Sequence, residues 1–133
     1  MAQKTATVAV INQDKKILIL RRGATAPWMP YHYCLPGGKV ENNEDLIECA
    51  SRELGEETGI AIVDNNLLSP FTIRYSDNYS KVIYYTSMNN PRVSLNWEHD
   101  HYAWVDSLES CGYNLVPGLK TTIKTLRDSG LLI

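Results

Sequence analysis

Seven carboxylates within seventeen residues are the feature of this sequence with the clearest chemical meaning. Glu41, Glu44, Asp45, Glu48, Glu53, Glu56 and Glu57 share this segment with one basic residue, Arg52. On a helix, Glu53, Glu56 and Glu57 have the i, i+3 and i+4 spacing that places side chains next to one another. The apolar residues of the same helix form one stripe that includes Leu54, and Glu57 falls within that stripe.

This clustering opposes the stability of the helix. Like charges at these spacings repel by roughly 0.2–0.5 kcal/mol per pair, and negative charge at a helix C-terminus opposes the helix dipole. A bound hard cation removes the conflict, because Mg²⁺ takes carboxylate oxygens as ligands and keeps waters that substrate phosphates can replace. The alternative is a solvated acidic face without a ligand.

The segment that carries the carboxylates is predicted to be a helix with well-marked ends. Asn42 or Asn43 is the expected N-cap, and acidic residues occupy the first turn. Gly59 is placed to adopt the left-handed conformation that follows a last helical turn. We therefore expect the carboxylates to lie at the end of a buried helical face.

Short strands and one further helix surround this segment. Residues 5–11 and 16–22 predict a hairpin, and residues 23–36 predict a loop with a short strand at 33–35, ended by a Pro36-Gly37-Gly38 turn. Downstream, residues 67–75, 81–88 and 102–105 predict strands, and residues 115–126 predict an amphipathic helix. The order is mixed α/β, and the length is that of a single domain, residues 1–133.

Charge and cysteine content exclude several classes of protein. The net charge is −2, without the basic excess that polymeric nucleic acid attracts. Cys34, Cys49 and Cys111 have no metal-like spacing, which argues against a disulfide framework and a zinc site. No apolar run is long enough to span a bilayer or to form a signal peptide, so we expect a soluble, cytoplasmic protein that does not bind membranes.

Residues 38–60 read GKVENNEDLIECASRELGEETGI and match the pattern G-x5-E-x7-R-E-U-x-E-E-x-G-U, with U aliphatic, at every specified position. This pattern is the Nudix box, so the sequence resembles the Nudix (MutT-like) hydrolase family. The flanks are also similar: Arg21-Arg22 ends a strand, Leu35-Pro36-Gly37-Gly38-Lys39 leads into the box, and Glu98-His99-x-x-Tyr102-x-Trp104 follows it. The resemblance implies a Nudix fold, an α/β/α sandwich around a mixed, curved sheet.

The resemblance also implies roles for the residues of the box. Glu53, Glu56 and Glu57, with the carbonyl oxygen of Gly38, would bind Mg²⁺, and Mn²⁺ is the other candidate ion. Arg52 would orient the glutamates, and Glu44 would support the loop before the helix. Arg52, Glu53 and Glu57 are thus the expected catalytic residues of the box. The alternative for Arg52 is an ordinary ion pair on a helix.

The implied reaction is hydrolysis of a nucleoside diphosphate linked to another group, such as a nucleoside triphosphate, a nucleotide sugar or a dinucleoside polyphosphate. Arg22 and Lys39 are the expected phosphate-binding cations, since strand alternation lets only one of two adjacent arginines face the site and the resemblance favours Arg22. Trp28 and Tyr31 are candidate stacking surfaces for a base, and Tyr33 and Tyr79 are further aromatic candidates in loops. We expect a small nucleotide substrate, and a protein that works as a monomer or a homodimer.

Glu98 is a further candidate catalytic residue. It lies in a polar loop between two strand-like segments, where functional residues tend to lie. In Nudix enzymes that this segment resembles, a glutamate at this point approaches the metal and acts as a general base or ligand. A solvated loop acid is the alternative, and Asp100 is a nearby competitor for the role.

A different class of function stays open at this stage. A Nudix fold can serve as a catalytically weak nucleotide-binding or sensor module rather than as an enzyme. Modules of that kind usually have a degenerate box, whereas every specified box position is present in this chain. The sequence therefore favours an enzyme.

Overall fold

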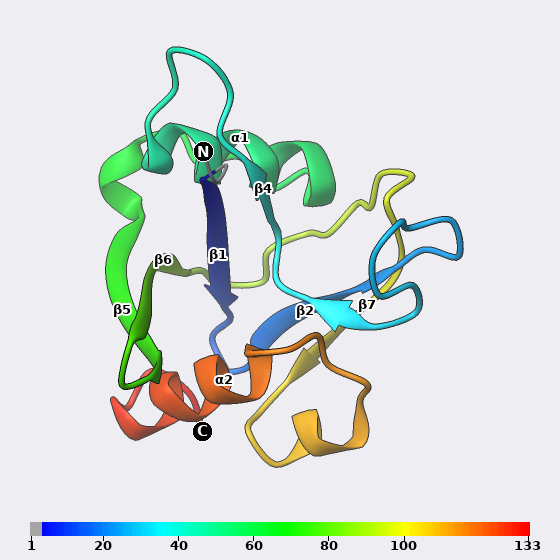
Figure 1. Cartoon of the computed structure of the whole chain (residues 1–133), viewed down its shortest axis with the longest axis vertical. Coiled ribbons are helices and arrows are strands. Elements are labelled where there is room, and N and C mark those ends of the chain that lie inside the picture. The colour runs from blue at the N-terminus through cyan, green and yellow to red at the C-terminus, as the bar shows by residue number, and fades with distance from the viewer. Residues whose placement is uncertain (1–3) are drawn as a thin grey trace.

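A mixed β-sheet forms the centre of the molecule in the computed structural model, which describes residues 4–133 (Figure 1). Within these residues, seven strands pair into the sheet: β1 (Thr5–Ile11), β2 (Ile17–Arg22), β3 (Tyr33–Cys34), β4 (Gly37–Lys39), β5 (Ser69–Ser76), β6 (Tyr79–Ser87) and β7 (His99–Val105). The main path runs β3-β2-β1-β6-β5, while β4 pairs with β1 and β7 pairs with β2. Strands β1 and β6 are parallel, and the other pairs are antiparallel.

Two helices cover opposite faces of this sheet. Helix α1 (Leu46–Thr58) lies across the top of Figure 1, and α2 (Leu119–Asp128) lies at the bottom. Successive side chains of strand β1 point to opposite faces of the sheet, so this strand contributes to the hydrophobic core on each face. Val8 and Val10 pack in the cluster with α1, whereas Ala9 and Ile11 pack in the cluster with α2. The α/β/α sandwich around a mixed sheet that the sequence led us to expect is confirmed.

Helix α1 begins later than the sequence suggested. Its N-cap is Asp45, not Asn42 or Asn43, because Asp45 and Glu48 form a reciprocal capping box. The Asp45 Oδ1 accepts from the Glu48 N–H at 2.9 Å, and the Glu48 Oε1 accepts from the Asp45 N–H at 3.2 Å. Asn43 has a φ of 65°, which is incompatible with the extended conformation of an N-cap. At the other end, Gly59 has a φ of 73° and forms the left-handed cap as predicted.

The segment predicted to be a Pro36-Gly37-Gly38 turn is partly a strand. Gly37–Lys39 forms β4, which pairs with β1 through Thr5↔Lys39, Ala6↔Gly38 and Thr7↔Gly37. A methyl group added at Gly37 would overlap the carbonyl oxygen of Ala6. Gly37 therefore serves a close approach of two strands, which a sequence pattern does not distinguish from a turn.

The other boundaries move by a few residues. Strand β7 begins at His99 rather than at residue 102, and α2 begins at Leu119 rather than at residue 115. The later start of α2 has a local cause, because Leu115 bridges to Tyr33 and Gly118 has a φ of 88°. Two short 3₁₀ helices, η1 (Asn65–Leu67) and η2 (Glu109–Gly112), complete the elements.

The structure also bears on the cysteines and on the membrane. Cys34, Cys49 and Cys111 are free thiols, and the first two are buried. Among residues 4–133, no helix combines the length and the apolar character needed to cross a bilayer.

Candidate active site

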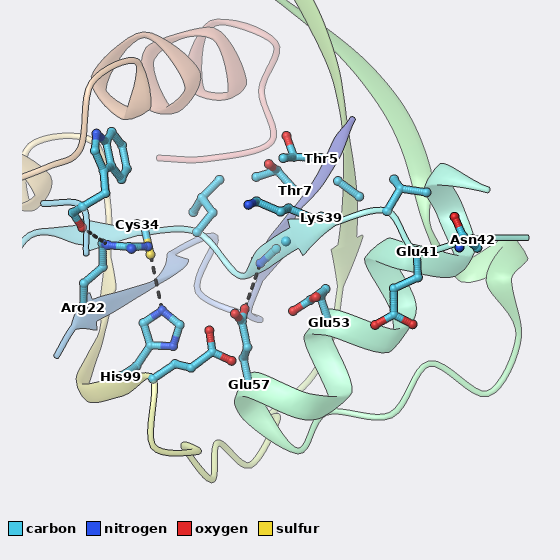
Figure 2. A pocket seen from close by; sticks show the side chains of 17 residues that line it. Thr5, Thr7, Arg22, Cys34, Lys39, Glu41, Asn42, Glu53, Glu57 and His99 are labelled. Carbon is cyan, nitrogen blue, oxygen red and sulfur yellow. Dashed lines mark hydrogen bonds between the residues drawn. The ribbon is translucent and has the colours of Figure 1, made fainter. Parts of the chain in front are cut away.

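One cleft of about 950 Å³ collects residues from five separate parts of the chain (Figure 2). Helix α1 contributes Glu53 and Glu57, and the β1–β4 edge contributes Thr5, Thr7, Gly37, Gly38 and Lys39. The end of β2 and the loop after it contribute Arg22 and Trp28, β3 contributes Cys34, and the start of β7 contributes Glu98 and His99. In Figure 2 the glutamates of α1 lie on one side of β4, and Thr5, Thr7 and Lys39 lie on the other.

The two α1 carboxylates lie directly against the backbone of β4. The Glu57 Oε1 accepts from the Gly37 N–H at 2.9 Å. The Glu53 carboxylate fills the space in which a Cβ atom at residue 38 would stand, so glycine is required for this contact. The side chains that the sequence placed at the end of a buried helical face are thus held beneath a glycine-containing strand.

These carboxylates lie in an environment that disfavours their charge. Glu57 is only 3% exposed, and burial, followed by the charges of Glu53, Glu98 and Glu56, raises its pKa to about 8. Burial also raises the pKa of Glu53. Near neutral pH the cleft therefore favours a protonated Glu57 or, in place of the proton, a bound cation.

Arg52 connects helix α1 to the loop before it. Its Nε and Nη2 donate to the two Glu44 carboxylate oxygens at 2.7 and 3.0 Å, and Nη2 also donates to the Lys39 carbonyl oxygen at 3.2 Å. Its Nη1 donates to Glu53 at 3.1 Å and to Glu56 at 3.2 Å. The Arg52 hydrogen bonds are the main cause that lowers the pKa of Glu44 to about 2. The contacts favour an orienting function for Arg52 over a simple surface ion pair.

Glu56 differs from its two neighbours. Its side chain is half exposed, bonds to Arg52, and is absent from the cleft lining in the described part of the chain. Glu98 does line the cleft, with its Oε1 accepting from the Asn96 amide at 3.3 Å. The structure thus brings together Glu53, Glu57 and Glu98, and it leaves Glu56 outside the lining.

Of the two adjacent arginines, Arg22 faces the cleft. Its Nε donates to the Trp28 carbonyl oxygen at 2.6 Å, and its guanidinium carbon lies 5.3 Å from the centre of the Trp28 ring. Arg21 instead pairs with Asp100, at 2.7 Å between Nε and Oδ1. Lys39 and Trp28 also line the cleft, whereas Tyr31 is 56% exposed and lies outside its lining.

His99 and Cys34 are cleft residues that sequence reasoning did not assign to the site. His99 is buried, and its Nε2 lies 3.5 Å from the Cys34 sulfur. Within residues 4–133, its Nδ1 finds no hydrogen-bond partner. Burial lowers the pKa of His99 and raises that of Cys34 to about 12, so both groups are held neutral. The only signal in the sequence was the position of His99 next to Glu98.

The donor set of this cleft matches a hard divalent cation, because it consists of carboxylate and carbonyl oxygens. The raised pKa values of Glu53 and Glu57 show that positive charge is lacking around these two side chains. Among residues 4–133, no three histidine, cysteine, aspartate or glutamate side chains converge as a finished metal-binding group. The described carboxylates thus lie near one another without forming a complete set of metal ligands.

Fold and cleft together define a phosphate-anhydride hydrolase of the Nudix class, and comparison with known proteins agrees. The family described as NUDIX domain matches residues 1–121, and the chain belongs to this family of hydrolases, which act on nucleoside diphosphate derivatives and generally use divalent metal ions. Nucleoside triphosphatase NudI of Escherichia coli O139:H28 is 30% identical over 145 residues, covering 99% of this chain and 100% of the relative.

Solved structures show the same fold. The MutT protein from Methanosarcina mazei Go1 superposes with a TM-score of 0.77 at 24% identity, over 95% of this chain and 93% of that one. A bifunctional NMN adenylyltransferase/ADP ribose pyrophosphatase from Francisella tularensis, complexed with AMP and a manganese ion, superposes with a TM-score of 0.76 at 18% identity. That match covers 97% of this chain and 42% of the other.

Alanine at each of the two glycines of β4 should affect a different property: the stability of the fold at Gly37, and the affinity for metal at Gly38. Gly37→Ala places a methyl group against the Ala6 backbone, so the free energy of unfolding should fall by about 2 kcal/mol. Gly38→Ala meets only the end of the Glu53 side chain, so it should remain folded and lose at least tenfold in Mn²⁺ affinity. Urea unfolding and calorimetric Mn²⁺ titration measure the two effects. Gly55→Ala, whose added methyl group would make only an ordinary contact of 3.9 Å with the Ile60 carbonyl oxygen, is the control. Equal metal affinity in Gly38→Ala and wild type would contradict this account.

The raised pKa of Glu57 predicts that, in the absence of metal, the folded protein becomes less stable as pH rises. Its folded-state pKa of about 8 exceeds the unfolded value of 4.5, so the native state binds more protons between these values. The free energy of unfolding should fall as pH rises through this range, by up to about 1.4 kcal/mol per unit. Urea unfolding in EDTA at pH 5.5 and 8 should show a steeper fall in wild type than in Glu57→Gln.

Two controls define this experiment. Glu56→Gln, next to Glu57 but exposed, removes only the smallest of the three neighbouring charges that raise the pKa of Glu57, so it should keep most of the wild-type dependence. Millimolar Mg²⁺ should restore stability at pH 8, because a bound cation stabilises the ionised carboxylate. An unchanged pH dependence in Glu57→Gln would assign the effect to other groups.

Proposed function

We propose that this protein is a Mg²⁺-dependent pyrophosphohydrolase that converts a nucleoside triphosphate into a nucleoside monophosphate and pyrophosphate. The observation that carries the proposal is the division of the cleft, with Glu53 and Glu57 on one side of β4 and Lys39 on the other. A triphosphate bound between them meets a cation site and a positively charged side chain. The full-length similarity to a relative named as a nucleoside triphosphatase supports this substrate class over the other nucleoside diphosphate derivatives.

The proposed metal ligands are Glu53, Glu56 and Glu57 with the carbonyl oxygen of Gly38. Glu53 and Glu57 already face the cleft, whereas Glu56 would exchange its contact with Arg52 for the ion. When bound, a divalent ion reduces the negative charge of the polyphosphate and lowers the pKa of a coordinated water. Mn²⁺ has the same preference for oxygen ligands and is expected to replace Mg²⁺.

The remaining residues bind and orient the substrate. Arg22 and Lys39 supply positive charge to the phosphates, and the Arg22–Trp28 contact presents an aromatic ring beside the guanidinium. Arg52 acts as a positioning residue, because it joins Glu44, Glu53 and the Lys39 carbonyl in one network. Tyr31 is outside the cleft and has no place in this proposal.

Glu98 is the proposed general base. It enters the cleft from the start of β7, and its backbone is held where the Gly23 N–H donates to the Glu98 carbonyl oxygen at 3.1 Å. A carboxylate that does not bind the metal is a better proton acceptor for an attacking water than one that does. Asp100, the competitor in the sequence, bonds to Arg21 instead.

A substrate panel tests the proposal against the alternative of a weakly active sensor module. Wild type with Mg²⁺ is assayed for release of pyrophosphate or nucleotide from nucleoside triphosphates, nucleotide sugars, dinucleoside polyphosphates and 5′-triphosphate RNA. We expect the highest kcat/KM on a free nucleoside triphosphate. Tight nucleotide binding without turnover would favour the sensor module, and preference for RNA would contradict a small-nucleotide substrate.

Glu98→Gln should separate catalysis from folding. Loss of a general base lowers kcat by roughly 10²-fold or more, while the midpoint of thermal unfolding should change little because the side chain is partly exposed. Asp100→Asn is the matched control, two residues away and engaged outside the cleft, and its kcat should stay close to that of wild type. A larger loss in Asp100→Asn, or full activity of Glu98→Gln at saturating Mg²⁺, would overturn the assignment.

A further inference from the structure

A second hollow, of about 350 Å³, adjoins the β1 side of the cleft. Its lining comprises Tyr75, Tyr79, Lys81, Pro117 and Gly118. The Tyr75 and Tyr79 rings are nearly parallel, 26° apart, with their centres separated by 5.5 Å. Tyr79 remains 57% exposed. Ring faces of this kind bind flat heterocycles by stacking.

The floor of this hollow is held in place by packing. The Tyr75 hydroxyl lies 3.0 Å from the Thr122 hydroxyl of α2. Gly118 adopts a φ of 88°, and a methyl group there would lie 3.1 Å from the Tyr75 ring. The tyrosine ring therefore has a fixed position before any ligand binds, which reduces the entropy lost on binding.

Lys81 joins this hollow to the catalytic cleft. Strands β1 and β6 run in parallel with Val8 opposite Tyr84, so Lys81 lies beside the start of β1. Its Nζ donates to the Thr5 hydroxyl at 2.8 Å and to the Thr7 hydroxyl at 3.1 Å, and both threonines line the cleft. The ammonium group is thus held at the boundary between the two spaces.

This ammonium group lacks a counter-charge. Among residues 4–133, no carboxylate forms an ion pair with it, and burial lowers its pKa. An ammonium has three N–H donors, and the threonines accept two of them. The third donor is left for water or for a ligand, because the Lys81 side chain remains partly exposed.

We propose that Lys81 is a specificity-determining residue, which selects nucleobases that present a carbonyl oxygen where cytosine and adenine present an amino group. The proposal rests on the proposed function and adds the class of base: uracil, thymine or guanine, stacked against the tyrosine pair. The Lys81 N–H donates to the carbonyl oxygen of such a base. An exocyclic amino group at the same point would oppose one donor with another.

The test compares the binding of two ligands that differ mainly at this group. The α,β-imido analogues of UTP and CTP cannot be cleaved between their first two phosphates, so calorimetric titration in Mg²⁺ measures affinity without turnover. Wild type should bind the UTP analogue at least tenfold more tightly. Lys81→Met should lose about tenfold in affinity for the UTP analogue and less than threefold for the CTP analogue.

Two further variants complete the design. Lys81→Gln supplies both a donor and an acceptor, so it should bind the two analogues with similar affinity and covers the case in which Lys81→Met fails to fold. Lys124→Met is the matched control, since Lys124 is an exposed lysine on α2 that pairs with Asp128. This variant should keep the wild-type preference.

The outcomes separate this inference from the proposed function. An equal loss of affinity for both analogues in Lys81→Met would mean that Lys81 binds phosphate or ribose, and it would overturn the inference. Equal affinity of wild type for the two analogues, or an unchanged preference in Lys81→Gln, would also overturn it while leaving the hydrolase proposal intact. Failure of wild type to bind either analogue would contradict both.

Discussion

The close approach of helix α1 to strand β4 is the contact on which the rest of the site depends. Gly37 and Gly38 have no side chains, so the Glu57 carboxylate can accept from the Gly37 N–H and the Glu53 carboxylate can occupy the space above Gly38. Gly37 also allows β4 to lie close to β1. One short strand therefore separates the carboxylates of the helix, on one side, from Thr5 and Thr7 of the central sheet, on the other.

The energetic consequence is that ionisation of the buried carboxyl groups is unfavourable without added positive charge. Burial removes water from Glu57 and Glu53 and raises the pKa of each, while the nearby positive charge of Arg52 is shared among several partners. Arg52 fixes the loop through Glu44 more strongly than it neutralises the cleft, because its bidentate contact goes to Glu44. A divalent cation, which hydrolases of this family generally use, would supply positive charge at this point and would couple metal binding to the stability of the fold.

Strand alternation divides the cleft into two chemically different halves. Residues of α1 approach one face of the sheet, whereas Thr5, Thr7 and Lys81 lie on the face that α2 covers. The positively charged side chains of Arg22 and Lys39, which we propose to bind phosphate, line the same cleft. A substrate with a charged polyphosphate and a flat, uncharged base matches this division, because each part then meets groups of complementary chemistry.

Local spacing in the sequence was enough to place the carboxylates on one helix, to assign Gly59 as its cap and to favour Arg22 over Arg21 by alternation and resemblance. Local spacing was misleading where two local structures were equally compatible with the sequence. Asn42 and Asn43 are good N-caps, yet the reciprocal Asp45–Glu48 pair caps the helix. Two glycines after a proline formed a strand rather than a turn. Only the tertiary structure decided which side chains meet. Glu98, His99, Cys34 and Lys81 reach the site from distant strands, and long-range strand pairing, which leaves no periodic signal in the sequence, sets their positions.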